Sequence, residues 1–399
     1  MSSLIDSQIL LLDTLIYCFD REASVRSGMT VDQLTQEVDS GLKRFMAKER
    51  ACMHDLGSEM MTYEEWFAII DAIRRDTRLN TLVMDLYHHD AHDGKMACFS
   101  DSLSNAYVIF SGTGDGEWRD DCYAAFLADS DQQLSALSWF KNQVLPKKYR
   151  SITVSGHSKG GNKAQYLGIR AGEDIQSVVS FDGQGFSREF LSTYQEEIDK
   201  YAHKITAYAL DNDYVNGLLN PVAPQPQRLF ILGPNLREPL AYHAPFSLFG
   251  PRKNDSYALR INRTSTQGAI GRLSVRLTDY LQSEAPYDDF VKVCSCLADI
   301  ADLVMNPGSR NEIAIRLSLA KINETDSFAM TMKYFSAFFH SVAQSEDPEN
   351  ISVFREITGF KEFTMPVADS LKSELAHLSE EVNKGQGKII PIESLRRKN

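Results

Sequence analysis

The feature that most constrains the fold is an alternation of short apolar runs with segments of helical character. The apolar runs lie at residues 106–110, 151–154, 177–181, 205–210 and 228–232, and the intervening helical segments at 130–145, 159–169 and 190–200. Runs that are apolar throughout predict strands buried on both faces, as in a parallel sheet covered by helices. Because consecutive parallel strands need right-handed crossovers, the sequence predicts an α/β fold with a mostly parallel central sheet.

Helical patterns flank this core on both sides. Residues 1–95 are interpreted as a helical N-terminal region, with a capping box at Thr62–Glu65. Residues 96–254 are predicted to form the α/β core. Residues 255–399 follow a polar, turn-rich segment and are predicted to form a helical C-terminal region or cap. Its expected helices lie at 287–305, 312–322, 328–342 and 366–382.

Composition excludes some classes of partner and location. The formal net charge of −12 opposes binding to nucleic acid through charge alone. The N-terminal sequence has no basic segment before its apolar residues, so no secretory signal is expected, and no apolar run approaches the ~18 residues of a membrane span. The six cysteines are scattered and are interpreted as reduced thiols, which predicts a cytoplasmic protein. They are Cys18, Cys52, Cys98, Cys122, Cys294 and Cys296.

Residues 156–160, Gly-His-Ser-Lys-Gly, match the G-x-S-x-G pattern of a nucleophile elbow. In such a turn the residues two before and two after the serine approach each other, so only small side chains fit. An apolar strand precedes the motif and a helical segment follows it, as this geometry requires. The sequence therefore predicts that Ser158 is a nucleophile at the helix N-terminus, where the helix dipole favours a developing negative charge.

A serine needs a base to accept its proton, and the expected chain order is serine, acid, histidine. His243 follows the last predicted strand in a loop, which is where the base belongs. His203 precedes a strand and lies at the wrong edge of the sheet. His340 and His377 fall within predicted helices and are interpreted as packed or surface residues.

The acid is expected after a strand that follows the nucleophile. The acid usually lies beyond the second such strand, which favours Asp211 and Asp213. Asp213 is preferred because Tyr214, Val215 and a helical or turn segment follow it. Asp211, on the same loop, and Asp182, after the first such strand, stay open as alternatives. Each of these aspartates could instead cap a turn.

An oxyanion hole needs two backbone N–H groups. The residue after the nucleophile, Lys159, is expected to supply one. The glycine-rich loop 110–116 is expected to supply the other, from Thr113. This loop lacks the Gly-Lys-Ser/Thr of a phosphate-binding P-loop, and no cofactor is implied.

Three segments resemble class 3 (fungal-type) lipases of the α/β-hydrolase superfamily. Residues 112–121 hold a Gly-Thr pair followed by a Trp and, three residues later, an Asp, which resembles the oxyanion loop of those lipases. Residues 156–162 resemble their G-H-S-x-G-G elbow. Residues 212–215 are similar to the segment that carries their triad acid, and this likeness assigns that role to Asp213.

A closer resemblance is to bacterial lipase-like hydrolases, which combine the elbow Gly-His-Ser-Lys-Gly-Gly-Asn with a later Phe-Asp-Gly-x-Gly-Phe, here 181–186. The resemblance covers roughly residues 1–250 and implies an α/β-hydrolase fold. The elbow has Lys159 where class 3 lipases usually have leucine. This lysine is expected to make the immediate site more polar than that of a triglyceride lipase.

The expected activity is hydrolysis of a small-molecule or lipid-like acyl ester through an acyl-enzyme on Ser158. Thioesters, amides and peptides are alternative substrates, because a Ser-Asp-His triad does not select the leaving group. A non-catalytic interaction protein with the same fold is a further alternative. His88 and His92 have the spacing of a zinc pair, but the segment 87–93 lacks the glutamate of HExxH and is interpreted as a solvated loop.

Overall fold

The computed structural model divides the chain into two compact units, Met1–Tyr334 and Phe335–Asn399. The structure describes residues 3–19, 23–52, 61–114, 116–233, 242–253, 256–261, 266–305, 318–319 and 321–344. Most of the helix expected at 312–322, and all of the helix expected at 366–382, lie outside these residues. The predicted boundaries after residues 95 and 254 stay a prediction.

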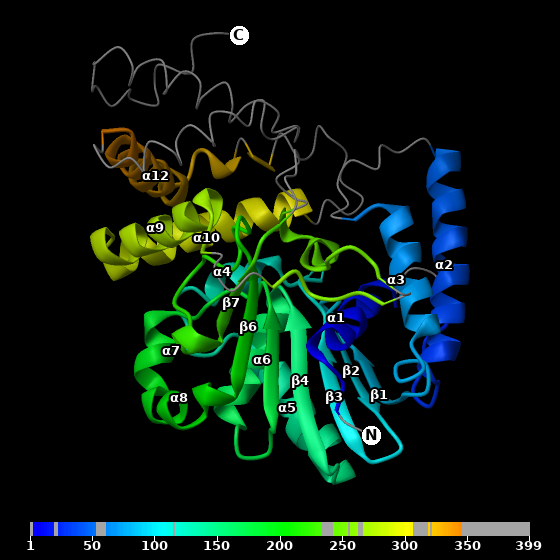
Figure 1. The fold of residues 1–399 in the computed structure, drawn as a ribbon. Helices are drawn as coiled ribbons and strands as arrows, with labels where there is room; N and C mark the ends of the chain where they lie inside the picture. Colours follow the sequence, from blue (N-terminus) through cyan, green and yellow to red (C-terminus); the bar gives the residue numbers. More distant parts are fainter. Residues whose placement is uncertain are drawn as a thin grey trace. The chain divides into compact units, whose positions relative to one another are not determined.

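The centre of the first unit is a sheet whose seven described strands follow one another in chain order (Figure 1). The strands are β1 Val83–His89, β2 Lys95–Ser100, β3 Asn105–Phe110, β4 Ser151–His157, β5 Ser177–Phe181, β6 Ile205–Leu210 and β7 Arg228–Ile231. The pairs β1–β2 and β2–β3 are antiparallel, and every later pair is parallel. The predicted mostly parallel α/β sheet is therefore confirmed.

The expectation that residues 1–95 are helical is wrong for 83–89, which form strand β1, and β2 begins at Lys95. β1 is an edge strand, and most of its residues are half-buried or exposed. It therefore needs no continuous apolar run. Asp85 interrupts its apolar residues and two histidines end it. A register shift between Met84 and Leu86 breaks the regular alternation further. These features hid the strand from the sequence pattern.

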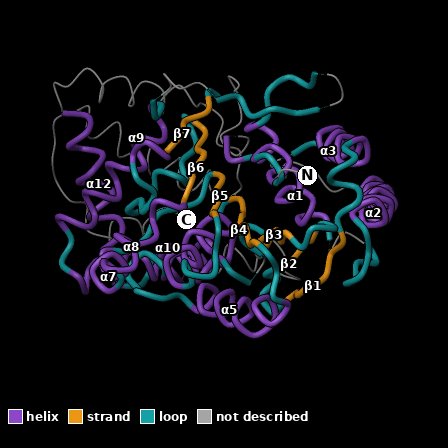
Figure 2. The backbone as a smooth tube through the Cα atoms, turned by 60° about the horizontal axis from the view of Figure 1, so that its bottom comes forward, coloured by secondary structure: helices purple, strands orange, loops and turns teal. Residues whose placement is uncertain are grey.

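Side chains of the sheet belong to two separate hydrophobic clusters, one on each face. Along β3, Tyr107 and Ile109 join one cluster, whereas Ala106, Val108 and Phe110 join the other. The first cluster is completed by helices α1 Asp6–Leu15, α2 Val31–Cys52 and α3 Tyr63–Arg75. The second is completed by α5 Asp131–Trp139 and α6 Lys159–Arg170. Figure 2 shows α1 and α5 on opposite sides of the sheet.

Several helices agree with the sequence pattern. Thr62 and Ser130 form the expected capping boxes of α3 and α5. The expected helix at 287–305 is α10 Tyr287–Met305, and that at 328–342 lies within α12 Asp326–Gln344. Further helices include η1 Ile16–Cys18, α4 Trp118–Tyr123, α7 Arg188–Thr193, α8 Gln195–Tyr201 and α9 Ala269–Glu284. The sequence pattern did not predict α4 or α9. α10 packs against α4.

None of the helices that the structure describes combines the length and the apolar character needed to cross a membrane. The cysteines with described side chains are free thiols, namely Cys18, Cys98, Cys122, Cys294 and Cys296.

A buried carboxyl group joins helix α1 to the central strand β4. Asp13 is fully buried and accepts a hydrogen bond of 2.6 Å from Ser155 Oγ through one of its oxygens. Its other oxygen is buried with no hydrogen-bond partner among the described residues. Burial raises the pKa of Asp13 well above its ordinary value, and the Ser155 hydroxyl only partly opposes this.

Replacing Asp13 by asparagine should therefore stabilise the fold increasingly as pH rises. The folded chain retains a proton on Asp13 that the unfolded chain loses above about pH 4. Between about pH 4 and the raised pKa of the folded state, this group lowers the wild-type free energy of unfolding by up to about 1.4 kcal/mol per pH unit. Asparagine does not titrate. The difference between the unfolding free energies of the variant and the wild type therefore gives the pH-dependent contribution of Asp13. Urea unfolding at pH 5 and pH 8 measures it, and an equal difference at both pH values would contradict it.

Candidate active site

Ser158 lies between strand β4 and helix α6 in a strained backbone conformation, with φ 60° and ψ −128°. The strain is imposed by close approaches on both sides. A Cβ added to Gly156 would lie 2.3 Å from the carbonyl carbon of Gly160, and a Cβ added to Gly160 would lie 2.1 Å from Phe110 O. Only glycine fits at these two positions. The turn therefore presents Ser158 at the carboxyl edge of the parallel strands, as the elbow pattern predicted.

The structure brings the three predicted triad residues into one hydrogen-bonded chain. His243 Nε2 lies 2.7 Å from Ser158 Oγ, and His243 Nδ1 lies 2.7 Å from Asp213 Oδ1. Asp213 is fully buried, and its second oxygen accepts a 2.7 Å hydrogen bond from the Asn216 backbone N–H. This second bond fixes the carboxylate, so the imidazole is held between the acid and the serine.

The two alternative acids have other partners. Asp211 Oδ1 accepts hydrogen bonds from the backbone N–H groups of Asn212 and Gly233, which is the turn-capping role weighed for it. Asp182 Oδ1 accepts hydrogen bonds from the Leu210 N–H and the Asn216 side chain. Burial raises the pKa of Asp182 well above its ordinary value, and the nearby Asp213 carboxylate raises it further.

Among the other candidate histidines, His203 does not join this group. His203 is exposed in the short helix Ala202–Lys204 that precedes β6, at the opposite end of that strand from Asp211. His340 is exposed on α12 in the second unit, and His377 lies outside the described residues.

Sequence reasoning missed the aromatic residues that surround the triad. Tyr17 Oη lies 2.8 Å from His157 Nδ1, and the His157 ring packs on the His243 ring with centroids 4.8 Å apart. Tyr214 contacts His243 from another direction, at 5.7 Å between ring centroids. His157 and Tyr214 adjoin recognised motifs, so their positions could have been suspected. Tyr17 comes from η1, 140 residues before His157, and carried no signal.

The residue after the nucleophile does not place its charge in the site. Lys159 is 1% exposed, and its ammonium lies 2.7 Å from an oxygen of Asp120 and 2.8 Å from an oxygen of Asp121. Burial alone would lower the pKa of Lys159, but these two carboxylates raise it above its ordinary value. The expectation that Lys159 makes the site more polar is therefore wrong, because its ammonium is buried against Asp120 and Asp121, and the local sequence does not determine the direction of the side chain.

The loop expected to supply the second oxyanion donor lies beside the elbow. Gly112 is packed so closely on Tyr17 that an added Cβ would lie 2.0 Å from the tyrosine oxygen. The next residue, Thr113, donates its hydroxyl to Asp121 Oδ2 at 2.6 Å. The same aspartate contacts Lys159, so Asp121 links the two residues predicted to form the oxyanion hole.

Two places in the chain gather potential metal ligands. His157, Asp182 and His243 offer buried atoms within 4.8 Å of one another, but both ring nitrogens of His243 already have partners in Asp213 and Ser158. Within the part of the chain that the structure describes, no group of three such ligand residues includes a residue of the segment 87–93. There His89 pairs with Asp93 at 2.5 Å, and residues 87–89 belong to β1 rather than to a loop.

The middle of the chain matches a known family. Residues 73–224 match the family model described as Mbeg1-like. Over those residues the match supports a relationship with lipase-like α/β-hydrolases. Its sheet and flanking helices are those of the α/β-hydrolase fold. No curated protein gives a significant match.

Two solved structures of fungal lipases are similar at low identity. The Lip2 lipase from Yarrowia lipolytica is 14% identical, with 67% of this chain and 88% of that chain covered and a TM-score of 0.33. A triacylglycerol lipase from Penicillium expansum is 15% identical, with 38% and 70% covered and a TM-score of 0.25. The activity proposed below does not rest on these two likenesses.

Gly160→Ala should destabilise the protein by at least about 2 kcal/mol, because the new methyl group would overlap the backbone oxygen of Phe110. Gly250→Ala is the matched control, since its added Cβ would meet its nearest atoms at 3.3 Å. Urea unfolding of both variants tests the difference. Similar stabilities for the two alanine variants would show that the elbow tolerates a side chain and is not closely packed.

Proposed function

We propose that the protein is a serine hydrolase that cleaves acyl esters through a covalent acyl-enzyme. The observation that carries this proposal is the chain of two 2.7 Å hydrogen bonds from Ser158 through His243 to Asp213. Nucleophile, base and acid occur in the chain order expected for an α/β-hydrolase. The match of residues 73–224 to a lipase-like family supports the same reaction class.

In the proposed reaction, Ser158 Oγ attacks the ester carbonyl carbon while its proton passes to His243 Nε2. Asp213 holds the imidazole in the tautomer with its proton on Nδ1 and stabilises the imidazolium. Backbone N–H groups of Thr113 and Lys159 bind the oxyanion. The imidazolium then gives its proton to the departing alkoxide. A water molecule then attacks the acyl carbon while His243 takes its proton. The imidazolium returns this proton to Ser158 Oγ as the acyl–oxygen bond breaks, which releases the carboxylic acid and restores Ser158 and neutral His243.

The neighbouring ring favours this proton transfer. Burial lowers the pKa of His157 well below its ordinary value, and proximity to His243 lowers it further. A neutral His157 places no second positive charge against the imidazolium that forms on His243. Tyr17, whose hydroxyl lies beside His157 Nδ1, fixes the orientation of that ring.

A fluorophosphonate probe should label Ser158, and His243→Ala should abolish both labelling and ester turnover. His203→Ala is the matched control, because His203 is exposed and remote from the site. Asp213→Asn should lower kcat by about 10⁴-fold through the wrong imidazole tautomer. Peptide mapping of the labelled protein and hydrolysis of short-chain p-nitrophenyl esters measure these effects.

Absence of labelling in folded wild-type protein would contradict the hydrolase proposal and favour a non-catalytic interaction protein. If Ser158 is labelled, matched ester, thioester and amide substrates identify the leaving group. The ester is expected to give the highest kcat/KM among the three. Residence in the cytoplasm stays a prediction from the sequence.

A further inference from the structure

Two lysines on helix α6 are buried in a way that the proposed reaction does not use. Lys159 and Lys163 are four residues apart, so they lie on the same face of the helix. Their side chains are fully buried, with exposed fractions of 0%. Lysine is rarely buried without a paired charge, because removing an ammonium from water is costly. Their partners therefore indicate what the burial achieves.

The first lysine is joined to the predicted oxyanion loop through an aspartate. Lys159 Nζ lies 2.8 Å from Asp121 Oδ1, and the other oxygen of Asp121 accepts the Thr113 hydroxyl at 2.6 Å. Asp120 completes the environment of the ammonium at 2.7 Å and is itself fixed by hydrogen bonds from Ser130 Oγ and the Gln132 N–H. Lys159 thus reaches Thr113 through one intervening side chain.

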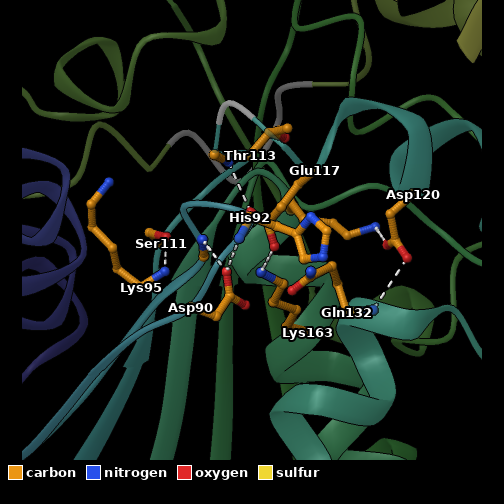
Figure 3. A network of polar contacts seen from close by, with 12 residues as sticks. Asp90, His92, Lys95, Ser111, Thr113, Glu117, Asp120, Gln132 and Lys163 are labelled. Carbon is orange, nitrogen blue, oxygen red and sulfur yellow. Dashed lines mark hydrogen bonds and ion pairs between the residues drawn. The ribbon is translucent and has the colours of Figure 1, made fainter. Parts of the chain in front are cut away.

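The second lysine is joined to the same loop through a glutamate. Lys163 Nζ forms an ion pair with Glu117 Oε1, and Glu117 Oε2 accepts a 2.8 Å hydrogen bond from the Gly114 backbone N–H. Figure 3 shows Glu117 and Lys163 facing each other beneath the loop that carries Thr113. Glu117 is fully buried, like its partner. Consecutive loop residues, Thr113 and Gly114, are thereby tied to consecutive turns of α6.

The charges of this cluster favour a fixed geometry. Burial opposes ionisation of Asp120, but the Lys159 ammonium and hydrogen bonds from Ser130 and Gln132 lower its pKa below the ordinary value. Burial raises the pKa of Glu117 despite the adjacent Lys163. Ion pairs buried this deeply stabilise a fold little relative to apolar contacts, but they are strongly directional. Their presence beside a nucleophile favours a role in positioning.

We propose that Lys159 and Lys163 are positioning residues that hold the loop 112–114 against the nucleophile elbow and so set the geometry of the oxyanion hole. This inference rests on the proposed hydrolase function. The backbone N–H of Lys159 is a proposed oxyanion donor, and its side chain positions the other proposed donor, Thr113. Tyr17 also packs closely against Gly112 of the same loop, which limits the movement of that residue.

Lys159→Met tests the role of the side chain while keeping the backbone N–H. The variant should lower kcat for a soluble ester by about 10- to 100-fold, because a loop misplaced by about 1 Å loses transition-state contacts. KM should change less than about threefold, since ground-state binding does not depend on the oxyanion donors. The affinity for a boronic acid, which mimics the tetrahedral intermediate, should fall by the same factor as kcat. Lys159→Arg, which retains the charge, should restore part of kcat.

Arg170→Met is the matched control, because Arg170 lies on the same helix and pairs with Asp129 at 2.8 Å, remote from the loop. It should change stability without changing kcat per active site. Active sites are counted by fluorophosphonate titration, so that a loss of folded protein is not mistaken for a loss of rate. Thr113→Val, which removes only the hydroxyl bonded to Asp121, should lower kcat in the same way and serves if Lys159→Met does not fold.

The outcomes separate the two proposals. Failure of the wild-type protein to react with fluorophosphonate overturns the hydrolase function. Normal labelling of wild type, combined with wild-type kcat and boronic acid affinity per active site in Lys159→Met or in Thr113→Val, overturns the positioning role alone. A parallel fall in kcat and boronic acid affinity, with KM nearly unchanged, supports both.

Discussion

The contact between Gly160 and the backbone oxygen of Phe110 is the constraint on which the rest of the site depends. It brings the first turn of α6 against the end of β3, where the loop 111–114 begins. Strands β3 and β4 are parallel neighbours, and the last residue of β3, Phe110, pairs with Gly156, one residue before the end of β4. The register of the sheet alone therefore places the turn at Ser158 beside the glycine-rich loop 111–114.

Much of this arrangement could be predicted from local sequence. Strands buried on both faces are continuous apolar runs, and the elbow needs glycine at fixed positions, so the parallel part of the sheet and the place of Ser158 were visible. Chain order and strand ends also indicated His243 and the pair Asp211 and Asp213, and the resemblance to class 3 lipases favoured Asp213. The structure brings His243 and Asp213 together. Their catalytic roles stay a proposal.

The features that could not be predicted depend on the direction of a side chain or on contacts between residues that are far apart in the sequence. β1 has a half-exposed face and a register shift, so its pattern does not resemble that of a strand buried on both faces. The charge of Lys159 was visible, but its direction depends on Asp120 and Asp121, which belong to another element. Tyr17 reaches the site only because α1 packs on β3 and β4. Such contacts arise from tertiary packing, and no local pattern in a single sequence indicates them.

The placement of Tyr17 also bears on where the functional unit of this protein begins and ends. The family match spans residues 73–224, which include Ser158 and Asp213 but neither Tyr17 nor His243. A segment cut to that match would keep the proposed nucleophile, Ser158. It would lose the proposed base, His243, and also Tyr17, whose hydroxyl contacts His157. The matched middle is thus not a separable module, and substitutions near residue 17 belong with those of the site when variants of this chain are compared.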